Sequence, residues 1–283
     1  MFVVLALVSA VCYGAADFLG GVTAKRASTL AVVVVSQLAG LLILLAICPL
    51  LPAADPTRTD FLWGALAGVS GGGGVALLYR ALAIGVMAVV APTTAVCAVV
   101  IPVFVSVALG ERLAAATFGG IALAIVAIIL VSQSNDGGSG RAGETDERRK
   151  KAFVLAVLSG IAIGFFFVAL ARTSSQAGLW PLVAARSASV ILFAVMAFFK
   201  SQSLRIPAAI LGIVAAGGAL DMLANLLYLL ASRSGPLSVV VTLASLYPAS
   251  TVLLARLVLH ERLSTRQWVG VGCALVAVAV IVH

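Results

Sequence analysis

The sequence predicts an all-α polytopic membrane protein with ten transmembrane helices, arranged as two inverted five-helix repeats. Three observations support this: a composition suited to a bilayer, ten apolar stretches of spanning length, and motifs that recur about 150 residues apart. Of the 283 residues, 63% are hydrophobic and only 10% are charged. A soluble domain is about half apolar and one quarter charged. The composition therefore argues against a soluble fold, a disordered chain and a nucleic-acid-binding protein.

Ten stretches are long and apolar enough to cross the hydrocarbon core, which takes about 20 residues of helix. We expect spans at residues 2–22, 29–50, 61–80, 87–109, 115–132, 152–171, 179–199, 207–231, 236–259 and 267–282. The first stretch has no basic segment before it, which favours an uncleaved span over a secretory signal. A polar segment rich in Gly and charge follows span five. It predicts three parts: a first repeat over 1–132, a linker over 133–151 and a second repeat over 152–283.

Short motifs return in the second half at a nearly constant offset. The pairs are Leu77–Tyr79 with Leu226–Tyr228, Glu111–Leu113 with Glu261–Leu263, Ser9 with Ser159, and Gly14 with Gly164. Each half holds five spans, and because five is odd the second half enters the membrane upside down relative to the first. Inverted repeats are typical of secondary transporters, which bind their substrate between the two halves.

The net charge of +8 is spread over short polar gaps, without the basic and aromatic patch that a nucleic acid would need. Twelve Lys and Arg residues fall in gaps after odd-numbered spans, and four fall in gaps after even-numbered spans. Basic residues concentrate on the cytoplasmic side of a membrane protein. This distribution predicts a cytoplasmic linker, both termini outside, and contacts with anionic lipid.

The cysteines lie singly inside apolar runs, and no His stands at metal-ligand spacing. We therefore expect no disulfide framework, no metal and no cofactor. Residues Gly68–Gly72 match the GxSG and GxSxG patterns of serine hydrolases. A serine nucleophile needs a base, however, and the two histidines, His260 and His283, lie at a span end and at the last residue. We expect that the protein is not an enzyme.

Besides Arg256, near the end of span nine, three charged residues lie inside spans, where a charge costs about 3 kcal/mol and normally faces a cavity or a partner. They are Asp17, Asp221 and Arg186. A carboxylate there could take up a proton or hold an amino group, and the arginine could meet an anionic group. The alternative is a structural one, in which Asp17 or Asp221 pairs with Arg186 and joins the helices.

Helical spacing groups other polar residues with these charges. Tyr13 lies one turn before Asp17, and Asn225 and Tyr228 follow Asp221 at steps of four and seven. The predicted substrate-binding residues are Tyr13, Asp17, Gln37, Arg186, Asp221, Asn225, Tyr228 and Tyr247. Hydrogen bonding between helices is the alternative role for the tyrosines and the asparagine. Tyr247 precedes Pro248, which would interrupt the helix and free a backbone carbonyl.

Several segments, taken in order, resemble the EamA branch of the drug/metabolite transporter superfamily over nearly the whole chain. The segments are Gly110–Leu113 and His260–Leu263, Gly235-Pro236, Tyr247-Pro248, and Trp180-Pro181 followed by Arg186. The family usually carries a proline thirteen residues before the glutamate that ends each repeat. Pro248 before Glu261 follows this pattern in the second half, whereas the first half has Ala98 at the corresponding position. The first-half counterpart of Arg186 falls near Val35–Gln37, which carries no cation.

This resemblance implies a transporter that exports or exchanges small metabolites, amino acids or drugs. It implies a cavity surrounded by spans one to four and six to nine, with spans five and ten as outer support. It also implies cytoplasmic termini, against the count of basic residues. The function we expect is secondary transport of a small organic solute across the cytoplasmic membrane by alternating access, with protons as a second candidate ligand. A channel or membrane scaffold is the alternative, and the sequence is compatible with a monomer and with a homodimer.

Overall fold

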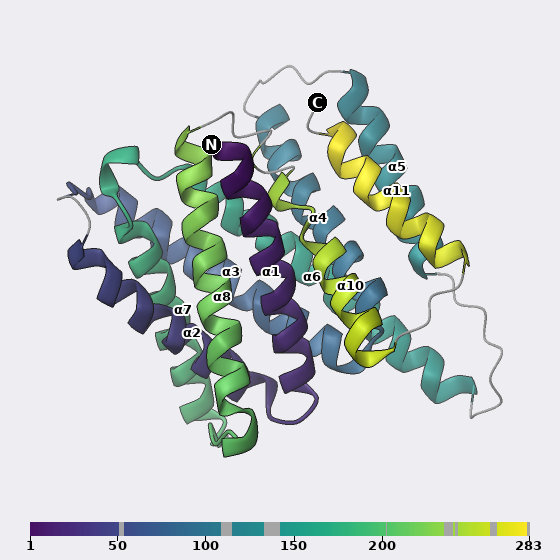
Figure 1. Cartoon of the computed structure of the whole chain (residues 1–283), viewed down its shortest axis with the longest axis horizontal. Helices are drawn as coiled ribbons and strands as arrows, with labels where there is room; N and C mark the ends of the chain where they lie inside the picture. The colour runs from purple at the N-terminus through teal and green to yellow at the C-terminus, as the bar shows by residue number, and fades with distance from the viewer. Residues whose placement is uncertain are drawn as a thin grey trace.

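The computed structural model of the chain is a bundle of helices that lie side by side (Figure 1). It describes residues 1–50, 54–108, 115–132, 142–201, 203–234, 240, 243–260 and 265–281. The α-helices of this part are α1 (Phe2–Ala24), α2 (Thr29–Ile47), α3 (Arg58–Ile84), α4 (Met87–Ala108), α5 (Ala115–Ser132), α6 (Ala142–Ala171), α7 (Trp180–Phe199), α8 (Ala208–Ser234), α10 (Tyr247–Leu259) and α11 (Thr265–Ile281). The predicted all-α fold of two five-helix repeats is confirmed.

Six helices in the described part are long and apolar enough to cross a membrane: α1, α2 with the turn that follows it, α3, α6, α7 and α8. Shorter apolar helices lie within α4, α10 and α11. Six of the ten expected spans are thus supported by length and hydropathy. The spans at α4, α5, α10 and α11 stay predictions as membrane crossings.

The predicted linker over 133–151 is partly helical. Helix α6 begins at Ala142, ten residues before the expected start of span six, and runs through the charged residues before it enters the apolar stretch. Glu, Arg and Lys are good helix formers. An ion pair of 2.6 Å between Asp146 and Lys150, one turn apart, adds to this preference. Residues 133–141 lie outside the described part of the chain, and the domain boundaries stay a prediction.

Span nine contains a break in the helix. The expected span covered 236–259, whereas α10 begins at Tyr247 after a turn at Ser245 and Leu246. Pro248 lies in the first turn of α10, where its missing N–H costs no hydrogen bond. The predicted interruption at Tyr247-Pro248 is confirmed. Thr251, one turn into α10, donates a hydrogen bond of 3.1 Å to the carbonyl of Gly14 in α1.

The contacts between helices show a pseudo-two-fold relation, in which a contact made by helices of one half is repeated by the equivalent helices of the other half. The contact of α1 with α8 has its counterpart in α6 with α3, and that of α3 with α7 has its counterpart in α8 with α2. Likewise α4 with α6 matches α10 with α1. Helices α2 and α7, α4 and α10, and α5 and α11 each contact their own equivalents. The last of these pairs lies together at one edge of the bundle (Figure 1).

Hydrogen bonds and close contacts repeat this symmetry at the residue level. Ser9 donates to the carbonyl of Ala224 at 2.8 Å, and Ser159, 150 residues later, donates to the carbonyl of Gly74 at 2.7 Å. Gly68 lies against the backbone of Ala185 in α7 as Gly218 lies against the backbone of Ser36 in α2. A side chain at either glycine would overlap the neighbouring backbone. These positions therefore require glycine for close helix approach.

A series of glycines in α3 lets this helix pack closely against α7. Gly64, Gly68 and Gly72 face α7 at one-turn intervals. Their neighbours there are Pro181, Ala185 and Ser189, which are also one turn apart. This series holds α7 close to α3, and so brings Arg186 into the middle of the bundle.

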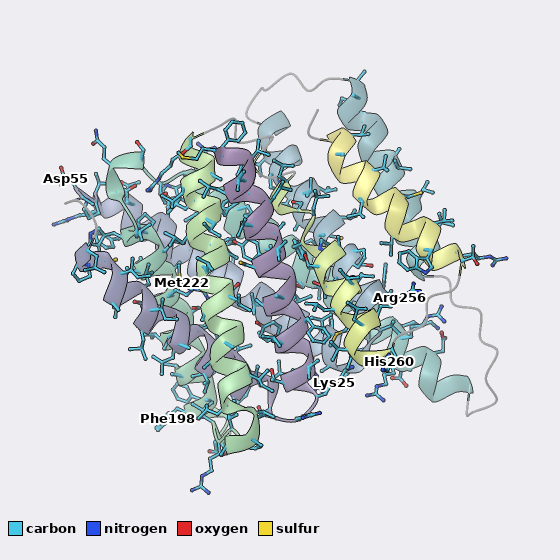
Figure 2. The ribbon with its side chains drawn as sticks, viewed as in Figure 1. Lys25, Asp55, Phe198, Met222, Arg256 and His260 are labelled. Carbon is cyan, nitrogen blue, oxygen red and sulfur yellow. The ribbon has the colours of Figure 1, made fainter. Side chains whose placement is uncertain are left out.

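A polar cluster ties three segments together at one end of the bundle. Thr57 and Asp60 form a capping box at the start of α3. The same Asp60 carboxylate accepts a hydrogen bond of 2.6 Å from the backbone N–H of Ser174, in the connection between α6 and α7. Arg233, in the last turn of α8, donates to the Ser174 carbonyl at 3.2 Å. The exposed Asp55 lies at this end, whereas Lys25 and Phe198 lie at the other (Figure 2).

Candidate functional site

A cavity lies between the two halves. Helices α1, α2 and α3 line it from the first half, and α6, α7, α8 and the start of α10 line it from the second. Its polar side chains are Tyr13, Asp17, Gln37, Arg186, Ser189, Asp221, Asn225 and Tyr247. The resemblance implied that α4 would also contribute, but none of its described residues lines the cavity.

Arg186 lies at the centre of the polar wall and is only 7% exposed. Its Nη1 donates to Oε1 of Gln37 in α2, and its Nη2 forms an ion pair with Oδ2 of Asp221 in α8. Ser189, almost one turn along α7, donates to the same Gln37 oxygen at 3.3 Å. Three helices from both halves are therefore joined through one guanidinium group. Of the two acids considered as structural partners of Arg186, Asp221 is the one that pairs with it.

A second chain of hydrogen bonds links α1 to α8, the helix that carries Asp221. The hydroxyl of Tyr13 donates to Oδ1 of Asn225 at 2.9 Å, and Nδ2 of Asn225 donates to the backbone carbonyl of Asp221 at 2.7 Å. The ring of Tyr13 meets that of Tyr247 edge to face, with ring centroids 6.4 Å apart. This geometry is favourable for two aromatic rings.

Asp17 differs from the other charged groups of the cavity. It follows Tyr13 by one turn of α1 and is 8% exposed. Within the described part of the chain, no hydrogen bond or ion pair of its side chain is found. The carboxylate therefore lines the cavity without a hydrogen-bond or ion-pair partner among the described residues.

The cavity brings together all but one of the predicted site residues. The exception is Tyr228, whose ring packs against Phe167 with centroids 5.1 Å apart, and whose buried hydroxyl has no hydrogen-bond partner among the described residues. Seven residues beyond Asp221 correspond to about 10 Å along a helix. Tyr228 therefore shares a face with Asp221 but lies past the end of the cavity.

The prediction missed the apolar wall, which includes Ile163, Phe166, Phe167 and Val75. The repeat could have located much of it, because cavity positions occur in equivalent pairs about 150 residues apart. The pairs are Tyr13 with Ile163, Asp17 with Phe167, Gln37 with Arg186, Gly71 with Asp221, and Val75 with Asn225. The lining is thus symmetric in position and asymmetric in chemistry.

Comparison with known families identifies the chain. A model of the EamA-like transporter family matches residues 1–133 and again residues 150–283. The chain belongs to the EamA-like transporter family. This EamA-family protein is therefore a multi-pass membrane transporter, as the resemblance of its motifs implied.

A solved structure described as "Crystal structure of protein" supports the fold. It matches the EamA-family chain with a TM-score of 0.62 at 16% identity, over 96% of this chain and 95% of that chain. At this identity the likeness concerns the fold alone. No curated protein matches the sequence.

Membership of a transporter family also argues against the serine-hydrolase alternative. The hydroxyl of Ser70 donates to the carbonyl of Leu66 in its own helix, at 3.0 Å. This residue lines a separate apolar groove between α3 and α6, away from the charged cavity. The Gly-rich motif around it is used for helix packing.

Proposed function

We propose that this EamA-family protein is a secondary transporter that exports a small organic solute across the cytoplasmic membrane by alternating access. The observation that carries the proposal is the placement of the charged groups: Gln37 of the first half and Arg186 and Asp221 of the second meet in one cavity. A site at the interface of inverted repeats changes its access when one half moves against the other.

The packing on either side of the cavity supports this mechanism. Along α1, α6 and α8, the cavity residues lie between two apolar clusters, one of which contains Leu82 and Val214 and the other Leu170 and Leu229. In alternating access, one cluster would separate while the other stays packed. Packed apolar surfaces change between discrete arrangements more readily than they deform continuously, which suits a gate at each end.

The proposal is tested by solute counterflow in liposomes that contain the purified full chain. The panel holds amino acids, nucleosides, sugars and lipophilic cations, each with and without a proton gradient. We expect saturable counterflow of at least one class, and we expect Asp221→Asn to abolish it while the protein still inserts and stays monodisperse. Asp55→Asn is the matched control, because this exposed carboxylate lies at the end of the bundle.

Two results would contradict the proposal. Flux that does not saturate and shows no counterflow would indicate a channel. Wild-type flux in well-folded Asp221→Asn protein would remove the cavity from the transport mechanism.

A further inference from the structure

The described cavity lining has more acidic side chains than basic ones. Among its described lining residues, two are carboxylic acids, Asp17 and Asp221, and one is a base, Arg186. The Arg186–Asp221 ion pair is internally neutral. Asp17 is left as a buried carboxyl group without a basic partner among the described lining residues, and a bound cation would favour its charged form.

Arg186 is poorly suited to bind an anionic group of a substrate. Its two terminal nitrogens already donate to Gln37 and Asp221. A substrate carboxylate would either share a guanidinium whose charge Asp221 already compensates, or displace Asp221 and leave it without a basic partner. Breaking a buried ion pair in this way is strongly unfavourable. The geometry therefore disfavours anions and zwitterions.

The surroundings of Asp17 suit a cation. Tyr13 lies one turn before it, and Tyr247 meets Tyr13 edge to face at 6.4 Å. Tyr247 is 5% exposed, and its hydroxyl is buried without a hydrogen-bond partner in the described part of the chain. Aromatic rings attract cations through their negative faces, most strongly where water is excluded. Phe166, Phe167 and Val75 supply an apolar wall for the rest of a ligand.

We propose that the solute is an organic monocation with an apolar body. Its charged nitrogen pairs with the Asp17 carboxylate beside Tyr13 and Tyr247, and the Arg186–Asp221 pair serves as a neutral joint between helices. This inference rests on the proposed transport function and names the substrate class of the same cavity.

The test measures binding to the detergent-purified full chain by isothermal titration calorimetry. Four probes share a benzyl body and differ in charge: benzyltrimethylammonium, benzyl alcohol, phenylalanine and phenylacetate. The quaternary ammonium cannot lose its charge. We expect it to bind at least about tenfold more tightly than the other three.

Variants of Asp17 locate the binding site. We expect Asp17→Asn to weaken benzyltrimethylammonium binding by about thirtyfold or more, because the charge partner is lost in a buried site. Asp17→Glu keeps the charge and should retain binding, and Asp55→Asn should bind like wild type. Thermal unfolding and monodispersity check that each variant is folded.

Three results overturn the inference: tighter binding of phenylalanine or phenylacetate than of the cation, no cation binding to folded wild-type protein, or unchanged cation binding by Asp17→Asn. Liposome counterflow of the bound probe separates this inference from the proposed function. Saturable counterflow of phenylalanine alone would contradict the assignment of a cationic substrate and would support the transport function. Cation binding that depends on Asp17, without any flux, would keep the assignment and contradict transport.

Discussion

Arg186 brings a positive charge into the middle of an apolar bundle, and two partners from different helices accept its N–H groups. The ion pair with Asp221 offsets the cost of removing both groups from water. Replacing one member alone therefore destabilises the protein more than replacing both, because it leaves the other charge buried without its partner.

This dependence predicts a large coupling between the two positions. We expect Asp221→Asn and Arg186→Gln each to lower the free energy of unfolding by about 3 kcal/mol, because each leaves one buried charge unpaired. The double variant should be more stable than the sum of the single effects implies, by about 1–3 kcal/mol. Thermal and denaturant unfolding in detergent measure this cycle. Strict additivity would contradict the ion pair.

The sequence located the charged groups but not their partners. Asp17, Asp221 and Arg186 were identified because a charge inside a span is costly and needs a reason. Which acid pairs with Arg186 depends on how α7 and α8 are rotated about their axes, and hydropathy does not fix this rotation. The position of Tyr228 was misjudged for a related reason, since a shared helical face does not define how far the cavity extends along it.

Close approach of α3 and α7 depends on the absence of a side chain at Gly68. A Cβ atom there would overlap the backbone of Ala185, and a helix backbone cannot yield as a flexible side chain can. By contrast, nothing lies within 4 Å of a Cβ placed on Gly73 of the same helix.

We therefore expect Gly68→Ala to lower the free energy of unfolding by about 3 kcal/mol. Gly73→Ala should be neutral or slightly stabilising, because alanine favours the helix by about 1 kcal/mol over glycine. Size-exclusion profiles and melting temperatures of the two variants in the same detergent make the comparison. Equal effects would mean that α3 and α7 do not approach as closely as described.

The helices themselves were largely predictable, and the departures have local causes. In a bilayer every backbone group must be satisfied within the chain, so apolar length alone predicts a helix. The early start of α6 was missed because a Gly-rich, charged segment is typical of a linker, while its second part consists of good helix formers. The late start of α10 was signalled by Pro248, but the proline alone could not fix the first helical residue.

The two-fold relation of the halves is expressed in two buried hydrogen bonds with the same geometry. Ser9 and Ser159 each donate to a carbonyl of the facing helix at nearly the same distance. Since the two bonds share no residue and join different pairs of helices, α1 with α8 and α6 with α3, we expect their effects to be independent.

Ser9→Ala and Ser159→Ala should each cost about 0.6 kcal/mol of unfolding free energy, as hydrogen bonds between membrane helices do on average. The double variant should lose the sum of the two single decreases in unfolding free energy. Unfolding of the four proteins in one detergent gives the comparison. A large effect at one serine and none at the other would contradict equivalent roles in the two repeats.

The uneven distribution of Lys and Arg predicts an orientation for the whole molecule. The end of the bundle near Lys25 and Phe198 carries the charged start of α6, and Lys200 follows Phe198 by two residues; we expect this end in the cytoplasm. A membrane-impermeant maleimide should then label Lys200→Cys only in inverted vesicles, and Asp55→Cys only in intact cells. The reverse pattern would place both termini in the cytoplasm.

The paired positions around the cavity have a consequence for how such a molecule could arise. Two separate copies of one five-helix unit, packed head to tail, would present every cavity side chain twice. Their acids and bases would then always occur in even numbers. The described lining instead has a single Arg186, equivalent to Gln37, and two carboxylates, Asp17 and Asp221, whose equivalents are Phe167 and Gly71. An odd number of acidic and basic groups of this kind requires that the two units have diverged, which a single chain that joins them allows.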